Sequence, residues 1–301
     1  GPRQSGKTTS IEHYISENGL SGETLTFNGD ETVDRDLLAD ASADKLKLLV
    51  GKKKVVFIDE AQKIPEIGIV LKRFYDKVKD VQVIVSGSSS DELALKTEEP
   101  LTGRKFEYVL LPMSFNELAS ASSPIDEMRQ LERRLMFGSY PDDVVHAGDE
   151  VDRIREIGKG YLYKDILKYD EIKRPELIDK LLRALAFQIG QEVSFAELAQ
   201  LVGSDPKTVS KYIDILEKAF IVFKLGSYSR NLRNELKKSR KVYFYDLGIR
   251  NYVLGDWRAL DLRGADEVGH IWENYFILER RKYIMAKAIL KAFSRLKEER
   301  A

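Results

Sequence analysis

The sequence predicts an α/β fold in its first third and a mostly helical arrangement after it. Up to about residue 115, short runs of apolar and β-branched residues alternate with segments of helical periodicity. This is the pattern of a parallel sheet covered by helices. From Ser114 onward strand signals stop, and helical segments with charged faces continue to about Tyr169. Strand-like runs return only after residue 220, within a smaller unit of helices and strands.

Four strands are expected in the N-terminal part, and the runs over 54–59 and 81–86 are apolar and rich in β-branched residues, as buried parallel strands are. A helix is expected over 67–75, where apolar residues recur at helical spacing. The expected strands are 25–27, 54–59, 81–86 and 106–111.

The segment after residue 173 carries the signals of a winged helix-turn-helix. A helix over 177–189 is followed by Ser194 and Glu197, a capping box that opens a short helix ending at Gly203. Asp205 then precedes a helix over 207–218, and two strands follow at 221–224 and 242–245, separated by a polar loop. Two helices joined by a Gly-containing turn and followed by two strands predict a winged helix.

The chain therefore divides into four expected parts: a sheet core over 1–115, a helical lid over 116–172, a winged-helix domain over 173–255 and an incomplete C-terminal segment over 256–301. The last part contains one apolar helix around 271–283 and a charged helical end. A turn, Gly138-Ser139-Tyr140-Pro141, interrupts the lid.

Composition limits the classes of protein that this chain can be. Lys plus Arg and Asp plus Glu both number 49 among 301 residues, so a globally basic nucleic-acid coat is excluded and only local basic patches remain. Zero cysteines exclude disulfides, thiolate metal sites and a cysteine nucleophile, and suit a cytoplasmic location. No apolar stretch approaches the roughly 20 residues needed to cross a bilayer, so no membrane partner is expected.

The first eight residues spell the phosphate-binding pattern G-x-x-x-x-G-K-[ST]. Glycines at both ends let backbone N–H groups turn towards phosphate oxygens, and the helix that follows offers its positive N-terminus. Lys7 is predicted to neutralise the β- and γ-phosphates, and the Thr8 hydroxyl to bind Mg²⁺. A plain glycine-rich turn is the alternative. The expected nucleotide-binding residues are Gly1, Pro2, Arg3, Gln4, Ser5, Gly6, Lys7, Thr8 and Thr9.

Two acids end the second expected strand. Four apolar residues lead to Asp59 and Glu60, so the strand delivers Asp59 to the edge of the sheet, where its carboxylate can hold the Mg²⁺ water shell near Thr8. Glu60 points differently and is predicted to polarise the attacking water. The alternative, a strand ending in a solvated acidic turn, weakens because the two motifs predict each other.

Three further residues are weaker catalytic candidates. Ser86 and Ser88 follow the third expected strand, where a hydroxyl can contact the γ-phosphate or the water near Glu60; an ordinary serine-rich turn is the alternative. Arg104 precedes the fourth expected strand, where its guanidinium can enter a neighbouring subunit's site as an arginine finger. That role requires a homo-oligomer, and a solvated surface arginine is equally compatible with the sequence.

A local basic surface is the candidate for DNA contact. Lys207 and Lys211 lie on the expected recognition helix, and basic residues crowd the expected wing, which suits phosphate attraction. Winged helices also serve as protein-contact modules, so a protein partner stays an alternative. The wing residues predicted to contact DNA are Arg230, Arg233, Lys237, Lys238 and Arg240.

Together these motifs resemble the prokaryotic AAA+-type P-loop ATPases, which pair a P-loop NTPase sheet and helical lid with a winged helix and a nuclease-like domain. The resemblance covers about 250 residues. It rests on Gly1 to Thr8, on Phe57-Ile58-Asp59-Glu60-Ala61-Gln62-Lys63-Ile64-Pro65, on Ser86-Gly87-Ser88-Ser89, on Leu101-Thr102-Gly103-Arg104 and on Leu111-Pro112-Met113-Ser114-Phe115-Asn116-Glu117. Three later segments also resemble the family: Gly138-Ser139-Tyr140-Pro141, Tyr161-Leu162-Tyr163-Lys164-Asp165-Ile166 and Tyr243-Phe244-Tyr245-Asp246-Leu247-Gly248-Ile249-Arg250.

The resemblance implies ATP rather than GTP, Walker roles for Lys7, Thr8, Asp59 and Glu60, a sensor role for Ser86 or Ser88, and a trans-acting Arg104. It also implies a strand before Gly1, which we expect in a longer chain. After Glu273 the sequence departs from the family's pattern, since no strands with spaced acids and a lysine follow.

The leading hypothesis is thus a cytoplasmic ATPase that binds ATP and ADP, uses Mg²⁺, and couples its cycle to DNA or a protein partner. Two alternatives remain open at this point. One is a slow nucleotide-dependent switch that controls assembly, and the other is a DNA-binding regulator with a vestigial P-loop.

Overall fold

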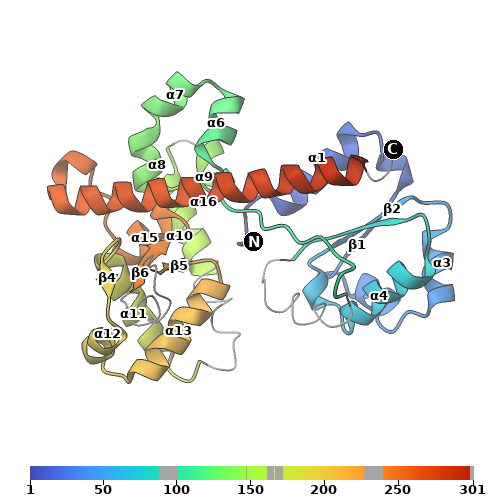
Figure 1. Cartoon of the computed structure of the whole chain (residues 1–301), viewed down its shortest axis with the longest axis horizontal. Helices are drawn as coiled ribbons and strands as arrows, with labels where there is room; N and C mark the ends of the chain where they lie inside the picture. The colour runs from blue at the N-terminus through green and yellow to red at the C-terminus, as the bar shows by residue number, and fades with distance from the viewer. Residues whose placement is uncertain (88–100, 147, 161–165, 167–171, 227–239, 299–301) are drawn as a thin grey trace. The chain divides into compact units, whose positions relative to one another are not determined.

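The computed structural model describes residues 1–87, 101–146, 148–160, 166, 172–226 and 240–298, with side chains to residue 287. The chain forms two compact units, Gly1–Leu110 and Leu111–Ala301. Most of their helices and strands are labelled in Figure 1, in which the colour runs from blue at the N-terminus to red at the C-terminus.

The first unit is built on three parallel strands in the order β1 (Thr24–Asn28), β2 (Val55–Asp59), β3 (Gln82–Val85). Asn28 lies opposite Asp59, and Ile58 lies opposite Val85, so the carboxyl ends of the strands meet at one edge. All five residues of the central strand β2 are buried, as expected for a parallel strand covered on both faces.

Helices and short turns connect these strands. One face of β2, with Val56 and Ile58, joins Leu46, Ile67 and other apolar residues of the helices in a single core. The connecting elements are α1 (Lys7–Glu17), η1 (Ser21–Glu23), α2 (Thr32–Leu38), α3 (Ala43–Val50), η2 (Ala61–Lys63) and α4 (Ile67–Lys77).

Three of the four predicted strands are confirmed to within one or two residues, and the predicted helix over 67–75 is α4. The fourth prediction, a strand over 106–111, is wrong, since residues 105–111 form neither helix nor strand. Phe106 and Tyr108 alternate with polar residues as in a strand, but both side chains are exposed. Alternation predicts a strand only where a neighbouring strand supplies the ladder of hydrogen bonds.

The second unit is mostly helical and contains one small antiparallel sheet in the order β4-β6-β5, with Val222 opposite Phe244. Its elements are α6 (Phe115–Ala121), α7 (Pro124–Arg129), α8 (Leu131–Phe137), α9 (Pro141–Val145), α10 (Glu150–Gly158), α11 (Pro175–Phe187), β4 (Glu192–Val193), α12 (Phe195–Val202), α13 (Pro206–Lys218), β5 (Val222–Leu225), β6 (Arg240–Phe244), α15 (Leu247–Leu254), η5 (Leu260–Leu262) and α16 (Ala265–Glu298).

The helix signals predicted after residue 173 are confirmed by the caps. The Ser194 side chain accepts a hydrogen bond from the backbone N–H of Glu197, and α12 stops at Gly203, whose φ of 72° is the left-handed end that glycine favours. Asp205 caps α13 by accepting from the N–H groups of Lys207 and Thr208, both at 3.0 Å.

One hydrophobic core joins helices from Leu135 to Ile271 of the second unit. Leu135 of α8, Ile154 of α10, Leu181 of α11, Ile213 of α13 and Ile271 of α16 all belong to it. Residues that the sequence assigned to a lid, a winged helix and a C-terminal segment therefore share one packed interior. The four-part division stays a prediction.

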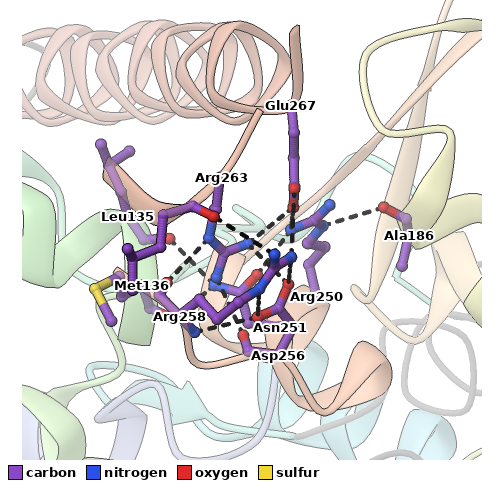
Figure 2. Close-up of polar contacts among 10 residues, drawn as sticks. Leu135, Met136, Ala186, Arg250, Asn251, Asp256, Arg258, Arg263 and Glu267 are labelled. Carbon is purple, nitrogen blue, oxygen red and sulfur yellow. Dashed lines mark hydrogen bonds and ion pairs between the residues drawn. The ribbon is translucent and has the colours of Figure 1, made fainter. Parts of the chain in front are cut away.

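A buried polar network also connects helices of the second unit (Figure 2). Arg250 of α15 is 1% exposed; its Nε donates to the Ala186 carbonyl at 3.1 Å and its Nη1 to Glu267 at 3.0 Å. Arg263 donates to the same Glu267 oxygen at 2.9 Å. The neighbouring Asn251 reaches the carbonyl of Met136, 2.7 Å away. Helices α8, α11, α15 and α16 are thus joined by hydrogen bonds as well as by apolar packing.

Within the described residues, none of the helices combines the length and the apolar character needed to cross a membrane.

Candidate nucleotide site

The predicted phosphate-binding loop forms a tight turn immediately before α1. Gln4 and Gly6 have positive φ values of 55° and 83°, so the backbone reverses twice within three residues. The buried Ser5 hydroxyl donates to the Pro2 carbonyl at 2.9 Å and fixes the loop internally. Lys7 Nζ lies against the same loop, close to the Pro2 carbonyl and 3.4 Å from that of Gly1. Loop and lysine thus occupy one small region.

Helix α1 gives this region its electrostatic character. It begins at Lys7, runs for 11 residues and has no acidic residue in its first turn. The first N–H groups of a helix have no partner within it and carry a partial positive charge, which favours a bound anion. Gly6, Lys7 and Thr8 stand at this end, and Thr9 is exposed beside them. The loop can therefore receive phosphate oxygens.

Thr8 and Asp59 are brought together although 51 residues separate them. The Thr8 hydroxyl donates to Asp59 Oδ2 over 2.8 Å. Asp59 ends β2, and its side chain is only 8% exposed. The predicted pairing of the P-loop threonine with the strand-end aspartate is thus present in the structure.

Ser86 lies on the other side of Asp59. Its buried hydroxyl donates to Asp59 Oδ1, and the Glu60 N–H donates to the same oxygen at 3.0 Å. The hydroxyl therefore orients Asp59, whereas the sequence predicted that it contacts a phosphate or the water near Glu60; that role stays a prediction. Ser88 lies outside the described residues.

Glu60 follows Asp59 in a left-handed backbone conformation, with φ of 45°. Two residues missed by the sequence interpretation surround it. The Gln62 side chain donates through Nε2 to Glu60 Oε2 at 2.6 Å. A Cβ at position 29 would lie 2.3 Å from the Glu60 carbonyl oxygen, so only glycine fits there. In the sequence, the one sign that Gln62 could be a buried polar residue was its place between the apolar residues Ala61 and Ile64. Both of these are buried in the structure.

Arg104 lies in the turn after residue 101, in the first unit. Its Nη1 is 3.4 Å from Asp76, and its guanidinium stands 5.4 Å from the centre of the Tyr75 ring, both on α4. The side chain is about one-third exposed. Its predicted trans action stays untested.

The residues present fit a magnesium ion. Among the described residues, no group of three or more Asp, Glu, His or Cys side chains could hold a metal by itself. Mg²⁺ commonly binds through one or two protein oxygens, with phosphate oxygens and water completing its shell. The adjacent Thr8 hydroxyl and Asp59 carboxylate supply that kind of donor set.

The predicted DNA-contact residues are only partly described. Lys207 and Lys211 are exposed on α13, and Arg240 is exposed at the start of β6. Arg230, Arg233, Lys237 and Lys238 lie outside the described residues. The neighbouring Lys241 pairs with Glu273 at 2.7 Å.

Comparison with protein families finds two matching regions in this chain. Residues 1–119 match the family described as an AAA domain. An AAA domain implies nucleotide binding, typically with Mg²⁺, and ATPase activity, and the matched residues include the loop, Asp59, Glu60 and Arg104.

The second unit matches a different family. Residues 128–258 correspond to a domain of unknown function, DUF8612, which covers α8 to α15. This match assigns no activity to the second unit.

Similar proteins occur in bacteria and archaea, and the three compared next are described as uncharacterized proteins. A Mycobacterium tuberculosis protein is 28% identical over 289 residues, covering 95% of this chain and 62% of its own length. A Haemophilus influenzae protein is 24% identical, covering 94% and 74%, and a Methanocaldococcus jannaschii protein is 22% identical, covering 94% and 65%. The chain thus spans less than two thirds of the mycobacterial relative.

Proposed function

We propose that this chain binds ATP with Mg²⁺ and hydrolyses it to ADP and phosphate, with Glu60 as the general base. The observation that carries the proposal is the 2.8 Å hydrogen bond between Thr8 and Asp59, next to Lys7 at the N-terminus of α1. A phosphate-binding helix end, a lysine and two oxygen ligands then lie in one place. These groups suit phosphoryl transfer, because that reaction depends chiefly on positioning the reactants and on neutralising the charge of the phosphates.

Each residue has a distinct task in this proposal. The loop N–H groups and Lys7 bind the phosphates and neutralise charge that develops on the leaving group. Thr8 and Asp59 would hold Mg²⁺, which neutralises phosphate charge when it is bound. Glu60 accepts a proton from the attacking water, and Ser86 keeps the Asp59 carboxylate oriented. Arg104 is proposed to act across subunits of a homo-oligomer.

Steady-state phosphate release tests the assignment of Glu60. We expect magnesium-dependent turnover from the 301-residue chain and a loss of about 100-fold in kcat for Glu60→Gln, since positioned general bases contribute roughly 10²–10⁴-fold. ATP affinity should be retained. Glu66→Gln, six residues along and exposed, is the matched control. Undiminished turnover in Glu60→Gln would overturn the assignment, and a slow wild type with intact ATP affinity would favour a nucleotide-dependent switch.

We further propose that the ATPase cycle is coupled to DNA through the second unit. The order α11-β4-α12-α13-β5-β6, with an antiparallel sheet, supports a winged helix in which α13 would be the recognition helix. Lys207 and Lys211 are exposed on α13, four residues apart and therefore on one face.

Duplex DNA binding by fluorescence anisotropy, at several salt concentrations and with or without ATP, tests the coupling. Lys207→Gln and Lys211→Gln should each weaken binding and reduce the salt slope by about one. Lys45→Gln in the first unit is the control. If DNA binding depends neither on the salt concentration nor on these two lysines, a protein partner is favoured as the target. DNA binding without any ATPase activity would favour a regulator with a vestigial P-loop.

A further inference from the structure

The turn after β2 is unusually constrained for a surface connection. Glu60 has φ 45° and ψ 40°, a left-handed conformation that is unfavourable for a non-glycine residue. Neighbouring backbone compensates for this cost. The Gly29 N–H donates to the Asp59 carbonyl at 2.8 Å, and the Ala61 N–H donates to the Ser86 carbonyl at 3.0 Å. The ends of both neighbouring strands therefore fix the backbone on which Glu60 stands.

This turn brings the side chain of residue 62 back to Glu60. Residues 61–63 form the single turn η2, and the Lys63 N–H donates to the Glu60 carbonyl at 3.0 Å. Gln62 is only 4% exposed, and its Nε2 is 2.6 Å from Glu60 Oε2. A carboxylate only accepts hydrogen bonds, so the nitrogen of the amide must face it. The amide thus fixes one of the two carboxylate oxygens.

The chemical type of this partner matters for a general base. A lysine or arginine at position 62 would form an ion pair, and the positive charge would make the carboxylate a weaker base. An amide carries no net charge and does not titrate, so it orients the carboxylate and leaves its charge in place. Proton transfer needs a base held within hydrogen-bond reach of the water.

We propose that Gln62 is a positioning residue that holds the Glu60 carboxylate in the orientation from which it accepts the proton of the attacking water. The inference rests on the proposed ATPase function and adds a residue to its machinery. Gln62 contacts Glu60 and is assigned no contact with nucleotide.

Two substitutions at Gln62 test the proposal in the 301-residue chain. Gln62→Leu removes the hydrogen-bond donor and puts an apolar side chain of similar size in the same buried place. We expect kcat to fall about tenfold, with the KM and Kd for ATP within about twofold of wild type. Gln62→Glu places a second carboxylate against Glu60. Below about pH 6 the new acid keeps a proton and donates it to Glu60, whereas at higher pH the two charges repel each other.

The pH dependence separates positioning from a purely structural role. Relative to wild type, kcat of Gln62→Glu should fall about tenfold further between pH 6 and pH 9, and the midpoint of thermal unfolding should not follow that curve. Gln82→Leu and Gln82→Glu, at an exposed glutamine of β3 in the same unit, are the matched controls and should leave kcat unchanged.

Each remaining outcome overturns a defined statement. In the first case, the wild type hydrolyses ATP and Glu60→Gln abolishes turnover, so the proposed function stands. The role of Gln62 is then wrong if Gln62→Leu keeps a wild-type kcat or if Gln62→Glu keeps a wild-type pH profile. If the wild type does not hydrolyse ATP, or Glu60→Gln turns over normally, both are wrong. Gln62→Glu remains informative if Gln62→Leu does not fold.

Discussion

The two units each bury a polar cluster, and the two clusters differ in the kind of partner that their charged groups have. Around Arg250 in the second unit, guanidinium groups contact the Glu267 and Asp256 carboxylates and the backbone carbonyls of Ala186 and Asp256. Around Asp59 in the first unit, a carboxylate accepts from the hydroxyls of Thr8 and Ser86 and from the Glu60 N–H. The Arg250 cluster pairs opposite charges, whereas the Asp59 cluster surrounds one negative charge with neutral donors.

That difference separates a structural cluster from a chemical one. Charges that are paired in the interior resist change, because removing one partner leaves the other buried without compensation. Hydroxyls can instead turn to another partner such as a cation, at a cost of one hydrogen bond, which is about 1 kcal/mol net. We therefore expect substitutions around Arg250 to change stability, and substitutions around Asp59 to change activity.

The largest expected effect is on the stability of the second unit. Arg250→Leu should lower its free energy of unfolding by about 3 kcal/mol, because Glu267 and the Ala186 carbonyl lose a buried donor. Trp257 and Trp272 both lie in this unit, so tryptophan fluorescence in urea reports it selectively. Arg183→Leu, at an exposed arginine of α11 outside this cluster, is the control and should change stability little. Equal midpoints for the two variants would contradict the structural role of the Arg250 cluster.

The next effect is on catalysis. Asp59→Asn should reduce magnesium-dependent turnover about 100-fold, equivalent to about 2.7 kcal/mol in the activation barrier, since the amide is a poorer Mg²⁺ ligand. The urea midpoint of the second unit should stay unchanged. Asp36→Asn, at an exposed aspartate of α2 in the same unit, is the control. Turnover at the wild-type level would remove Asp59 from the proposed site.

A third prediction concerns an acid that belongs to neither cluster. Asp143 is 2% exposed and neither of its carboxylate oxygens has a hydrogen-bond partner in the described part of the chain. Burial, followed by the charges of Asp246, Asp142 and Glu150, raises its pKa from 3.8 to about 8, against a smaller opposing effect of Arg153. The folded state then binds more protons than the unfolded state between about pH 4 and pH 8, so stability falls as pH rises through that window.

Asp143→Asn should accordingly stabilise the second unit by about 2 kcal/mol at pH 8, with little gain at pH 4.5. Urea unfolding at both pH values measures this. Asp142→Asn should have the opposite sign, since Asp142 forms a 2.8 Å ion pair with Arg153. A gain from Asp143→Asn that is the same at both pH values would show that ionisation is not the cause.

The smallest effect is expected at Ser86. Ser86→Ala removes one donor to Asp59 and should reduce kcat about tenfold, or about 1.4 kcal/mol, while Asp59 still accepts from Thr8 and the Glu60 N–H. Ser16→Ala, exposed on α1, is the control. A 100-fold loss at Ser86 would instead favour the direct phosphate or water contact that the sequence predicted.

The sequence identified the residues of the site where the chemistry depends on local spacing. The P-loop pattern placed Lys7 and Thr8 at the start of a helix, and an apolar run placed Asp59 at the end of a strand. Caps at Ser194, Gly203 and Asp205 gave the helix boundaries of the second unit to within a few residues. These features are local, because a loop, a cap and a buried strand are each set by a few consecutive residues.

The sequence did not predict the contacts that depend on which elements meet. Gln62 became a partner of Glu60 only because Gly29 and Ser86, which directly follow the neighbouring strands β1 and β3, fix the turn between them. Residues 106–111 had the pattern of a strand and formed none. By itself the sequence determined that a phosphate loop and two acids belong to one sheet. Tertiary structure decided how each carboxylate is held, because side-chain orientation depends on neighbours distant in the chain and on how deeply they exclude water.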